Sequence, residues 1–176
     1  MEYYHLQLCG LVRNLPLISL GPHLKIASLN LLGDGELVEK AAEELEKKIK
    51  EFEFDYLVGP EVKVVPLIHA LAQRLGKPRY VILRKNIMGY MIKPVSNNSK
   101  PTLVLNGIDA EILQDKKVFI IDDVVSTGRT IEVVEELMKA VGAEVVGVAA
   151  VLKQGADYKD FNIPFVYLGK LPLFQA

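Results

Sequence analysis

The stretch VFIIDDVVSTGRT, residues 118–130, decides the fold that this sequence encodes. Residues 118–121 are apolar and either β-branched or aromatic, which predicts a buried strand in the middle of a sheet. Two carboxylates, Asp122 and Asp123, follow directly, and a polar turn then leads into a helix expected over residues 131–140. In open α/β sheets ligands bind beyond the carboxyl ends of the strands. The stretch therefore predicts a parallel sheet and a ligand site together.

Strands and amphipathic helices alternate on both sides of this stretch. After Gly33-Asp34-Gly35, apolar residues recur at helical spacing, and Asp34 is a plausible N-cap of that helix. The apolar positions of this helix are Leu37, Ala41, Leu45, Ile49 and Phe52. Further strands are expected over residues 56–59, 79–83, 102–105, 144–152 and 165–168, and a second helix over residues 64–75. The alternation indicates an α/β fold with a central, mainly parallel sheet flanked by helices.

Two segments depart from this alternation. Residues 1–32 mix short apolar runs with prolines and glycines, which is typical of short strands and turns in a small appendage. Residues 86–101 are polar, irregular and long for a loop in a compact domain, and such loops are usually lids, binding loops or disordered. Because the chain has no internal repeats or obvious linkers, we expect residues 1–176 to form one domain.

The composition excludes several classes of function. Half of the 176 residues are apolar, which is typical of a globular chain. With 21 basic and 22 acidic residues the net charge is −1, which argues against partners such as nucleic acid or a membrane surface. No membrane span or signal peptide is expected. Cys9 is the single cysteine, so an internal disulfide is impossible and a reducing cytoplasm is the simplest compartment. The histidines lack metal-ligand spacing.

Each residue type in the polar turn has a physical reason to be there. Gly128 permits a tight turn and a close approach of the backbone to a ligand. The hydroxyls of Ser126, Thr127 and Thr130, with the backbone N–H groups of the turn and of the helix N-terminus, suit a phosphate monoester. The aspartates would repel phosphate, so they fit neighbouring ribose hydroxyls or water around a Mg²⁺ held by a diphosphate.

In this combination the stretch resembles the phosphoribosyl-diphosphate (PRPP) motif of type I phosphoribosyltransferases, a family with a central parallel sheet and a small N-terminal hood. The resemblance covers most of residues 34–152 and is closest to adenine phosphoribosyltransferase and related purine enzymes. It implies that Asp122 and Asp123 hold the ribose 2′- and 3′-hydroxyls. It also implies that the 5′-phosphate is bound by Ser126, Thr127, Gly128, Arg129 and Thr130.

A second segment resembles the diphosphate-binding loop of the family. Residues 59–64 read GPEVKV, and the resemblance assigns Glu61, Val62 and Lys63 to PRPP binding. Lys63 stands where adenine enzymes usually carry arginine, and it lacks the bidentate fork of that side chain. Val62 and Val64 replace small residues, which leaves a degenerate member of the family as one interpretation.

The segment after the strand over residues 79–83 also resembles the family. The pair Arg84-Lys85 implies contact with diphosphate, partly across the interface of a homodimer. Residues 86–101 correspond to a mobile lid that closes over the reacting ribose. Suitable lid residues are Lys93, Ser96, Ser99 and Lys100. Tyr90 is near the position of a tyrosine found in the lids of adenine enzymes, but its spacing differs.

The base pocket is the part for which the sequence leaves alternatives open. Residues 1–32 correspond to the hood that covers the base. Lys153 follows the strand over residues 144–152, and a lysine at this strand end reads the 6-oxo group in hypoxanthine-guanine enzymes. An exposed, uninvolved lysine is an equally good interpretation of Lys153. Adenine, giving AMP, and a 6-oxopurine (hypoxanthine, guanine or xanthine) therefore both stay open.

The implied reaction is purine salvage, in which a nitrogen of the base attacks C1 of PRPP and diphosphate leaves. Asp122 and Asp123 would fix the ribose, while Lys63 and Lys85, with Mg²⁺ brought mainly by PRPP, would stabilise the leaving group. A non-catalytic regulator that senses PRPP is the other alternative. The sequence has no recognisable DNA-binding module to support it.

Overall fold

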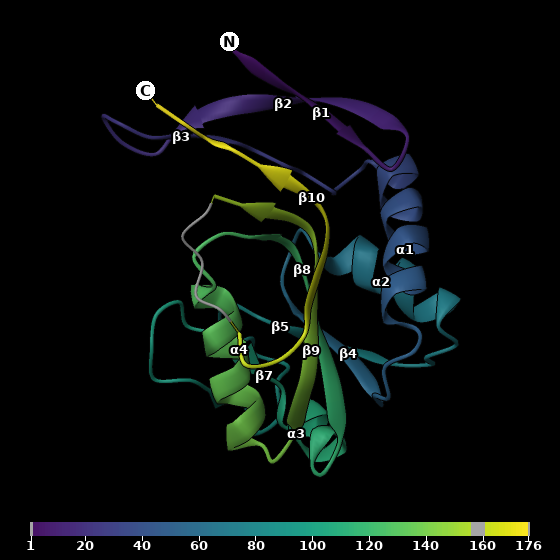
Figure 1. Cartoon of the computed structure of the whole chain (residues 1–176). Coiled ribbons are helices and arrows are strands. Elements are labelled where there is room, and N and C mark those ends of the chain that lie inside the picture. The colour runs from purple at the N-terminus through teal and green to yellow at the C-terminus, as the bar shows by residue number, and fades with distance from the viewer. Residues whose placement is uncertain (1, 156–160, 176) are drawn as a thin grey trace.

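The computed structural model describes residues 2–155 and 161–175, and its centre is a five-stranded parallel sheet. The strands lie in the order β10-β9-β8-β4-β5 (Figure 1). Their bounds are Phe165–Leu171 for β10, Glu144–Gln154 for β9, Lys117–Val125 for β8, Tyr56–Pro60 for β4 and Tyr80–Leu83 for β5. The sequence motif therefore lies on the middle strand, with a parallel neighbour on each side.

Helices cover both faces of this sheet. On one face pack α1 (Gly35–Ile49) and α2 (Val65–Arg74), and on the other packs α4 (Arg129–Ala140), as Figure 1 shows. Each face has its own buried apolar cluster, one with the inward positions of α1 and α2 and the other with those of α4. Because β8 and β9 are buried on both faces, they are apolar almost throughout, as a doubly covered parallel sheet requires.

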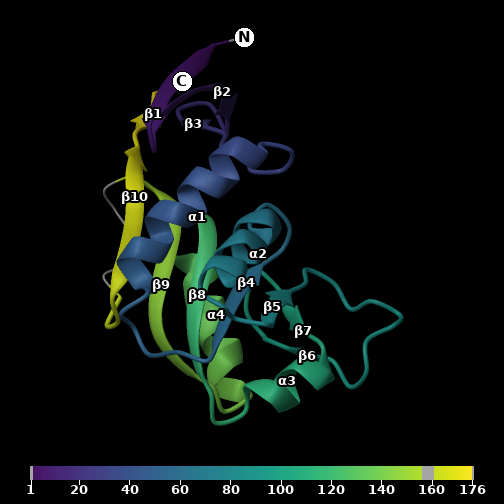
Figure 2. The same ribbon diagram turned by 90° about the vertical axis from the view of Figure 1, so that its right-hand side faces the viewer.

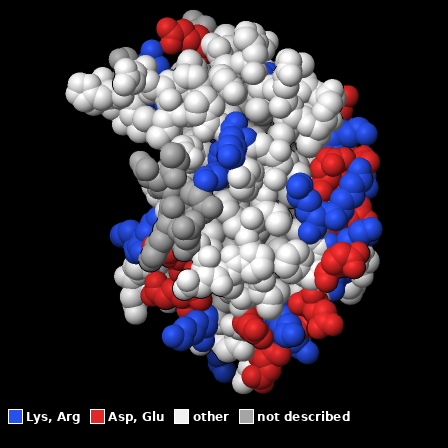
Figure 3. Space-filling model, viewed as in Figure 1, with Lys and Arg blue, Asp and Glu red and all other residues white. Residues whose placement is uncertain are grey.

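A small antiparallel sheet lies across one end of the central sheet (Figure 1). It contains β1 (Tyr3–Leu8), β2 (Leu11–Ser19), β3 (Lys25–Ala27) and, from the other end of the chain, β11 (Leu173–Phe174). The side of this sheet that is visible in Figure 3 carries few charges. Val12 on β2 and Leu20 just after it are exposed apolar residues. The pairing of β11 with β3 was absent from the predictions, which gave this appendage residues 1–32 alone.

One ion-pair cluster connects the antiparallel sheet to α1. The Arg13 guanidinium on β2 donates to Asp34 (2.7 and 3.0 Å) and to Glu36 (2.7 Å). The Asp34 carboxylate also accepts the backbone N–H of Leu37 (3.1 Å), so Asp34 is the N-cap of α1, as predicted. The hydrogen bond from Arg13 holds the pKa of Asp34 below its usual value.

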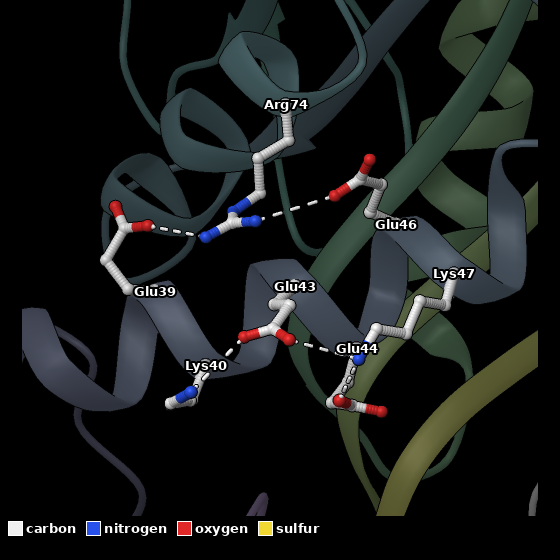
Figure 4. Close-up of polar contacts among 7 residues, drawn as sticks. All are labelled: Glu39, Lys40, Glu43, Glu44, Glu46, Lys47 and Arg74. Atoms are coloured by element: carbon white, nitrogen blue, oxygen red, sulfur yellow. Dashed lines mark hydrogen bonds and ion pairs between the residues drawn. The ribbon is translucent and has the colours of Figure 1, made fainter.

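The exposed faces of α1 and α2 are joined by ion pairs around Arg74 (Figure 4). Arg74 on α2 contacts Glu39 at 3.1 Å and Glu46 at 3.5 Å on α1. Within α1, Lys47 contacts Glu43 at 3.1 Å. Exposed pairs of this kind contribute little individually, so the buried apolar contact between the two helices holds this face together.

Several predicted elements differ in extent. The strand predicted over residues 118–121 continues as β8 to Val125, so both aspartates lie within it, and α4 starts at Arg129 and not at residue 131. The strand predicted over residues 102–105 is shorter in the structure, where β7 comprises only Val104–Leu105. It lies outside the central sheet and pairs antiparallel with β6 (Val95–Ser96). Phe52 lies beyond the end of α1, and a short helix, α3 (Gly107–Leu113), was not predicted.

The chain between β5 and β7 projects beyond the edge of the central sheet (Figure 2). It is tethered at its middle, because Gly107 donates its backbone N–H to the carbonyl of Ile92 (2.9 Å) and Asn106 accepts from the N–H of Ile92 (3.0 Å). Among the described residues, no helix combines the length and apolarity needed to cross a membrane.

Candidate active site

A cavity of about 830 Å³ opens where β4, β5 and β8 end. This volume lies within the usual range for small-molecule sites. The described residues of its wall come from the ends of the three strands and the segments that follow them, from residues 96–104 and from the first turn of α4. They are Pro60, Glu61, Val62, Lys63, Val64, Lys85, Asn86, Ile87, Ser96, Lys100, Pro101, Thr102, Leu103, Val104, Asp122, Asp123, Val124 and Thr130. Charged groups of both signs therefore surround one opening, at the carboxyl edge of the sheet where ligands bind in such folds.

A second hollow, of about 80 Å³, lies beside the first and is formed by residues 124–131 with Asp122. A hollow of this small size suits a compact anion such as a single phosphate group. Asp122, Val124 and Thr130 line both spaces, so a ligand with its phosphate in the hollow would extend directly into the larger cavity.

Gly128 determines the shape of the hollow. It has φ +81°, in the left-handed region that non-glycine residues rarely adopt. A Cβ at this position would lie 3.2 Å from the ring of Phe161, so the space there is also closed. The turn brings the N-terminus of α4 to the hollow, and the partial positive charge of the helix end favours an anion there.

Asp122 and Asp123 differ in their environment. Asp122 is buried, whereas Asp123 is partly exposed to the large cavity. Oδ1 of Asp122 accepts the backbone N–H of Asp123 at 2.8 Å. Burial, followed by the proximity of Asp123, raises the pKa of Asp122 well above its usual range, and Lys63 opposes this shift. The oxygens of the two carboxyl groups can accept hydrogen bonds from the hydroxyls of a bound sugar.

The loop after β4 brings Lys63 to the cavity. Its ammonium group donates to the backbone carbonyl of Leu29 at 2.9 Å, which anchors the loop against the chain before α1. The neighbouring Val62 is 52% exposed. Gly59 lets β4 pass close to β8, since a Cβ there would lie 2.6 Å from the carbonyl oxygen of Ile121.

Arg84 and Lys85, which are adjacent in the sequence, have different surroundings. The Arg84 guanidinium pairs with the Glu61 carboxylate and donates to the Tyr90 hydroxyl at 2.6 Å. Lys85 lines the large cavity, and its backbone N–H donates to Glu61 at 2.7 Å. Arg84 is not among the described residues of the cavity wall. Its predicted contact with diphosphate stays a prediction, and so does that of Lys85.

Lys153 lies further away, on β9 next to the edge strand. It pairs in register with Lys170, and both ammonium groups lie about 6 Å from the centre of the Tyr167 ring. Lys153 is not among the described residues that line either cavity. Its predicted role in reading the base remains untested.

The sequence analysis gave some residues of the cavity wall no specific role. Thr102 had no assigned role, and Ser96 and Lys100 were only general lid residues. The segment that carries them is ordered by the buried Asn97, whose amide accepts the N–H of Leu103 (2.7 Å) and donates to the carbonyl of Pro101 (3.1 Å). A buried asparagine within a polar, irregular stretch is not a signal that periodicity detects.

The described residues include no cluster of three or more metal-binding side chains. Asp122 and Asp123 offer two carboxylates at the rim of the cavity, which is too small a set for an independent cation site. These residues do fit a Mg²⁺ ion that arrives already bound to the oxygens of a diphosphate ligand.

A family model described as phosphoribosyl transferase domain matches residues 30–170. The chain belongs to this family. It is 33% identical to HGPRTase-like protein 3 of Haloterrigena turkmenica over 140 residues, which cover 77% of this chain and 73% of that protein. It is also 33% identical to the adenine phosphoribosyltransferase of Thermosipho melanesiensis, over 70% of this chain and 71% of that enzyme. Orotate phosphoribosyltransferases occur among the relatives as well.

Solved phosphoribosyltransferases share the fold. The adenine phosphoribosyltransferase of Thermoanaerobacter pseudethanolicus superposes with a TM-score of 0.74, over 89% of this chain and 95% of that one, at 23% identity. The chain thus has the type I phosphoribosyltransferase fold that its Asp-Asp motif predicted. The names of the relatives differ in the base on which they act, so the family leaves the base open.

Proposed function

We propose that this protein transfers the 5-phosphoribosyl group of PRPP to a purine base, with adenine as the first candidate. The observation that carries the proposal is the small hollow at residues 124–131, joined to the large cavity through Asp122, Val124 and Thr130. PRPP has a phosphate at one end, a ribose in the middle and a diphosphate at the other end. The two joined spaces match this order.

In this arrangement the 5′-phosphate occupies the hollow and is bound by Ser126, Thr127 and Thr130 with the backbone of Gly128 and Arg129. Asp123, on the cavity side, and the buried Asp122 accept the hydroxyls of the ribose. The diphosphate lies in the large cavity towards Lys63 and Lys85. Fixing the ribose at one end and the leaving group at the other holds C1 between diphosphate and base.

The chemistry needs little proton transfer from the protein. A nitrogen of the base attacks C1, the bond from C1 to diphosphate breaks, and positive charge develops on the ribose. The proton of the attacking nitrogen passes to the departing diphosphate or to water. The lysines stabilise the negative charge that the diphosphate gains on leaving. A Mg²⁺ ion brought by PRPP would supply positive charge to the leaving diphosphate, and Asp122 and Asp123 are the carboxylates that would lie near it.

A 6-oxopurine is the second candidate base. The relative from Haloterrigena bears a hypoxanthine-guanine type name, which favours it. The 33% identity to the Thermosipho enzyme supports adenine. Lys153 would support a 6-oxopurine only if its ammonium group turned from Tyr167 towards the base.

The surroundings of the cavity support a homodimer as the working assembly. Ile87, Tyr90 and Ile92, in the predicted lid, are 65%, 64% and 55% exposed. The three side chains lie within six residues of one another in the sequence, and groups of exposed apolar side chains are typical of interaction surfaces. We propose that a second copy of the chain covers these side chains.

We also propose that residues 86–101 close over the bound ribose and that residues 1–32 cover the base. The enzyme is proposed to work in the cytoplasm.

The test is turnover of adenine, hypoxanthine, guanine, xanthine and orotate with PRPP and Mg²⁺, followed by diphosphate release. We expect one purine to be used at a rate well above the others. Asp123→Asn and Thr127→Ala should each greatly reduce use of PRPP, whereas Lys116→Ala, an exposed position outside both cavities, should not. Full activity in the double variant would overturn the assignment of the site. PRPP binding without nucleotide formation from any base would favour the regulator.

A further inference from the structure

A third lysine reaches the large cavity from a different side from Lys63 and Lys85. Those two follow β4 and β5, whereas Lys100 precedes β7 and touches the N-terminal end of α4. Within residues 2–155 and 161–175, its ammonium group has no hydrogen bond or ion pair. A cation at the wall of a binding cavity without a protein partner is suited to an anionic ligand.

The backbone of Lys100 is fixed in place although its side chain is exposed. Its carbonyl oxygen accepts a hydrogen bond from Nε of Arg129 at 2.8 Å. The preceding residue, Ser99, donates its hydroxyl to Glu136 on α4 at 2.6 Å. Asn97, which is only 8% exposed, closes the turn by donating to the carbonyl of Ser99 at 2.7 Å. The segment around Lys100 is therefore docked on α4.

Arg129 provides this anchor from within the phosphate loop. Its guanidinium is directed to Lys100 and to Glu132 (3.0 Å), and its backbone follows Gly128 at the hollow. The backbone of Arg129 is thus available to the 5′-phosphate, while its side chain holds the segment that carries Lys100. One residue connects the two ends of the site.

We infer that Lys100 binds the diphosphate group of PRPP as a third cation and that Arg129 is the positioning residue that holds it there. The inference rests on the proposed function, because it takes PRPP as the ligand. Lys63 and Lys85 follow the ends of two adjacent strands, whereas Lys100 adds a cation from the segment docked on α4.

The test measures direct binding of three probes in the presence of Mg²⁺: PRPP, inorganic diphosphate and ribose 5-phosphate. Lys100→Met keeps most of the length of the side chain and removes its charge. We expect it to weaken PRPP and diphosphate about tenfold or more, on the scale of a lost charge-assisted hydrogen bond, and to leave ribose 5-phosphate unchanged. Lys100→Arg should restore most of the affinity, and Lys116→Ala is the matched control.

A double-mutant cycle tests Arg129. Arg129→Gln alone should weaken diphosphate and leave ribose 5-phosphate unchanged, and it should have no further effect when Lys100 is already methionine. An additive effect, or an equal loss of ribose 5-phosphate, would show that Arg129 acts in the phosphate loop and would overturn its positioning role. Thermal unfolding of each variant checks that the fold is kept.

The outcomes separate this inference from the proposed function. If the unaltered protein binds PRPP and diphosphate, and Lys100→Met binds both as tightly, the inference alone is overturned. If the unaltered protein binds neither PRPP nor ribose 5-phosphate, the proposed function falls, and the inference falls with it.

Discussion

The carboxylate of Glu61 pairs with the guanidinium of Arg84, and these residues follow two neighbouring parallel strands, β4 and β5. The same carboxylate accepts the backbone N–H of Lys85 at 2.7 Å. Glu61 therefore determines where the chain leaves β5 and, with it, where the Lys85 side chain enters the cavity. Glu61 thus organises the side of the cavity where we propose that diphosphate binds, and Arg84 already balances its charge.

Glu61→Gln tests this role. The glutamine keeps an oxygen that can accept the N–H of Lys85, but it loses the ion pair, so Arg84 would be left without its counter-charge. We expect the KM for PRPP to increase about tenfold, with a smaller change in kcat, on the scale of one lost charge-assisted bond. Glu111→Gln, an exposed position on α3, is the control. An unchanged KM for PRPP would contradict the organising role.

Asp122→Asn should separate stability from activity. The pKa of Asp122 is raised above its ordinary 3.8 in the folded chain, because of burial and the nearby Asp123. Between 3.8 and the raised pKa, the unfolded chain releases a proton that the folded chain retains, so stability falls as pH increases through this range. Asparagine removes this titration and keeps an acceptor for the N–H of Asp123.

We therefore expect the Asp122→Asn variant to unfold at a higher temperature than the unaltered protein at neutral pH, and at a similar temperature below pH 3.8. Its use of PRPP should fall, because an amide accepts ribose hydroxyls more weakly than a carboxylate. Thermal unfolding across pH, with turnover at neutral pH, measures both. A lower unfolding temperature at neutral pH would mean that the Asp122 charge stabilises the fold, contrary to the raised pKa.

The strand, turn and helix around the hollow at residues 124–131 were predictable from sequence because their determinants are local. The apolar run, the two aspartates and Gly128 all lie within residues 118–128. The types of these neighbouring residues are enough to predict a strand, a turn and the start of a helix. The structure adds that β8 continues through the aspartates, because Asp122 pairs with Ala150 of β9. Residues 118–130 alone do not reveal this pairing, because β9 is a separate segment further along the chain.

The contacts that sequence analysis missed are distant in sequence. Glu61 meets Arg84 because β4 and β5 are neighbours, and Lys100 meets Arg129 because residues 97–103 dock on α4. Gly147 is a similar case, since a Cβ there would lie 2.5 Å from the ring of Phe119. These contacts depend on how whole helices and strands pack against one another. No pattern of residue types along the chain therefore predicts them.

The connection between the antiparallel sheet and α1 can be tested at Asp34. Asp34→Ala removes the N-cap and the partner of Arg13, and we expect it to lower the free energy of unfolding by about 1–2 kcal/mol. Asp34→Asn keeps a capping oxygen and should lose less, because an ion pair that water still reaches contributes little. Chemical denaturation of both variants measures the difference. Equal losses in the two variants would show that the ion pair, and not the cap, carries the effect.

Gly128→Ala tests whether the shape of the phosphate hollow depends on the left-handed turn. Gly142, at the other end of α4, offers a matched control, because it has φ +77° and open space, with 3.7 Å from a Cβ to the nearest atom, in Gln114. Alanine in the left-handed region costs about 1–2 kcal/mol at either position. At Gly128 the methyl group would also press on Phe161 and displace the N–H groups of the loop. We expect both variants to lose similar stability from backbone strain, with a further loss for Gly128→Ala, but only Gly128→Ala to lose affinity for ribose 5-phosphate. If Gly142→Ala lost the same affinity, a general loosening of α4 would explain the result, and the hollow would not be the phosphate site.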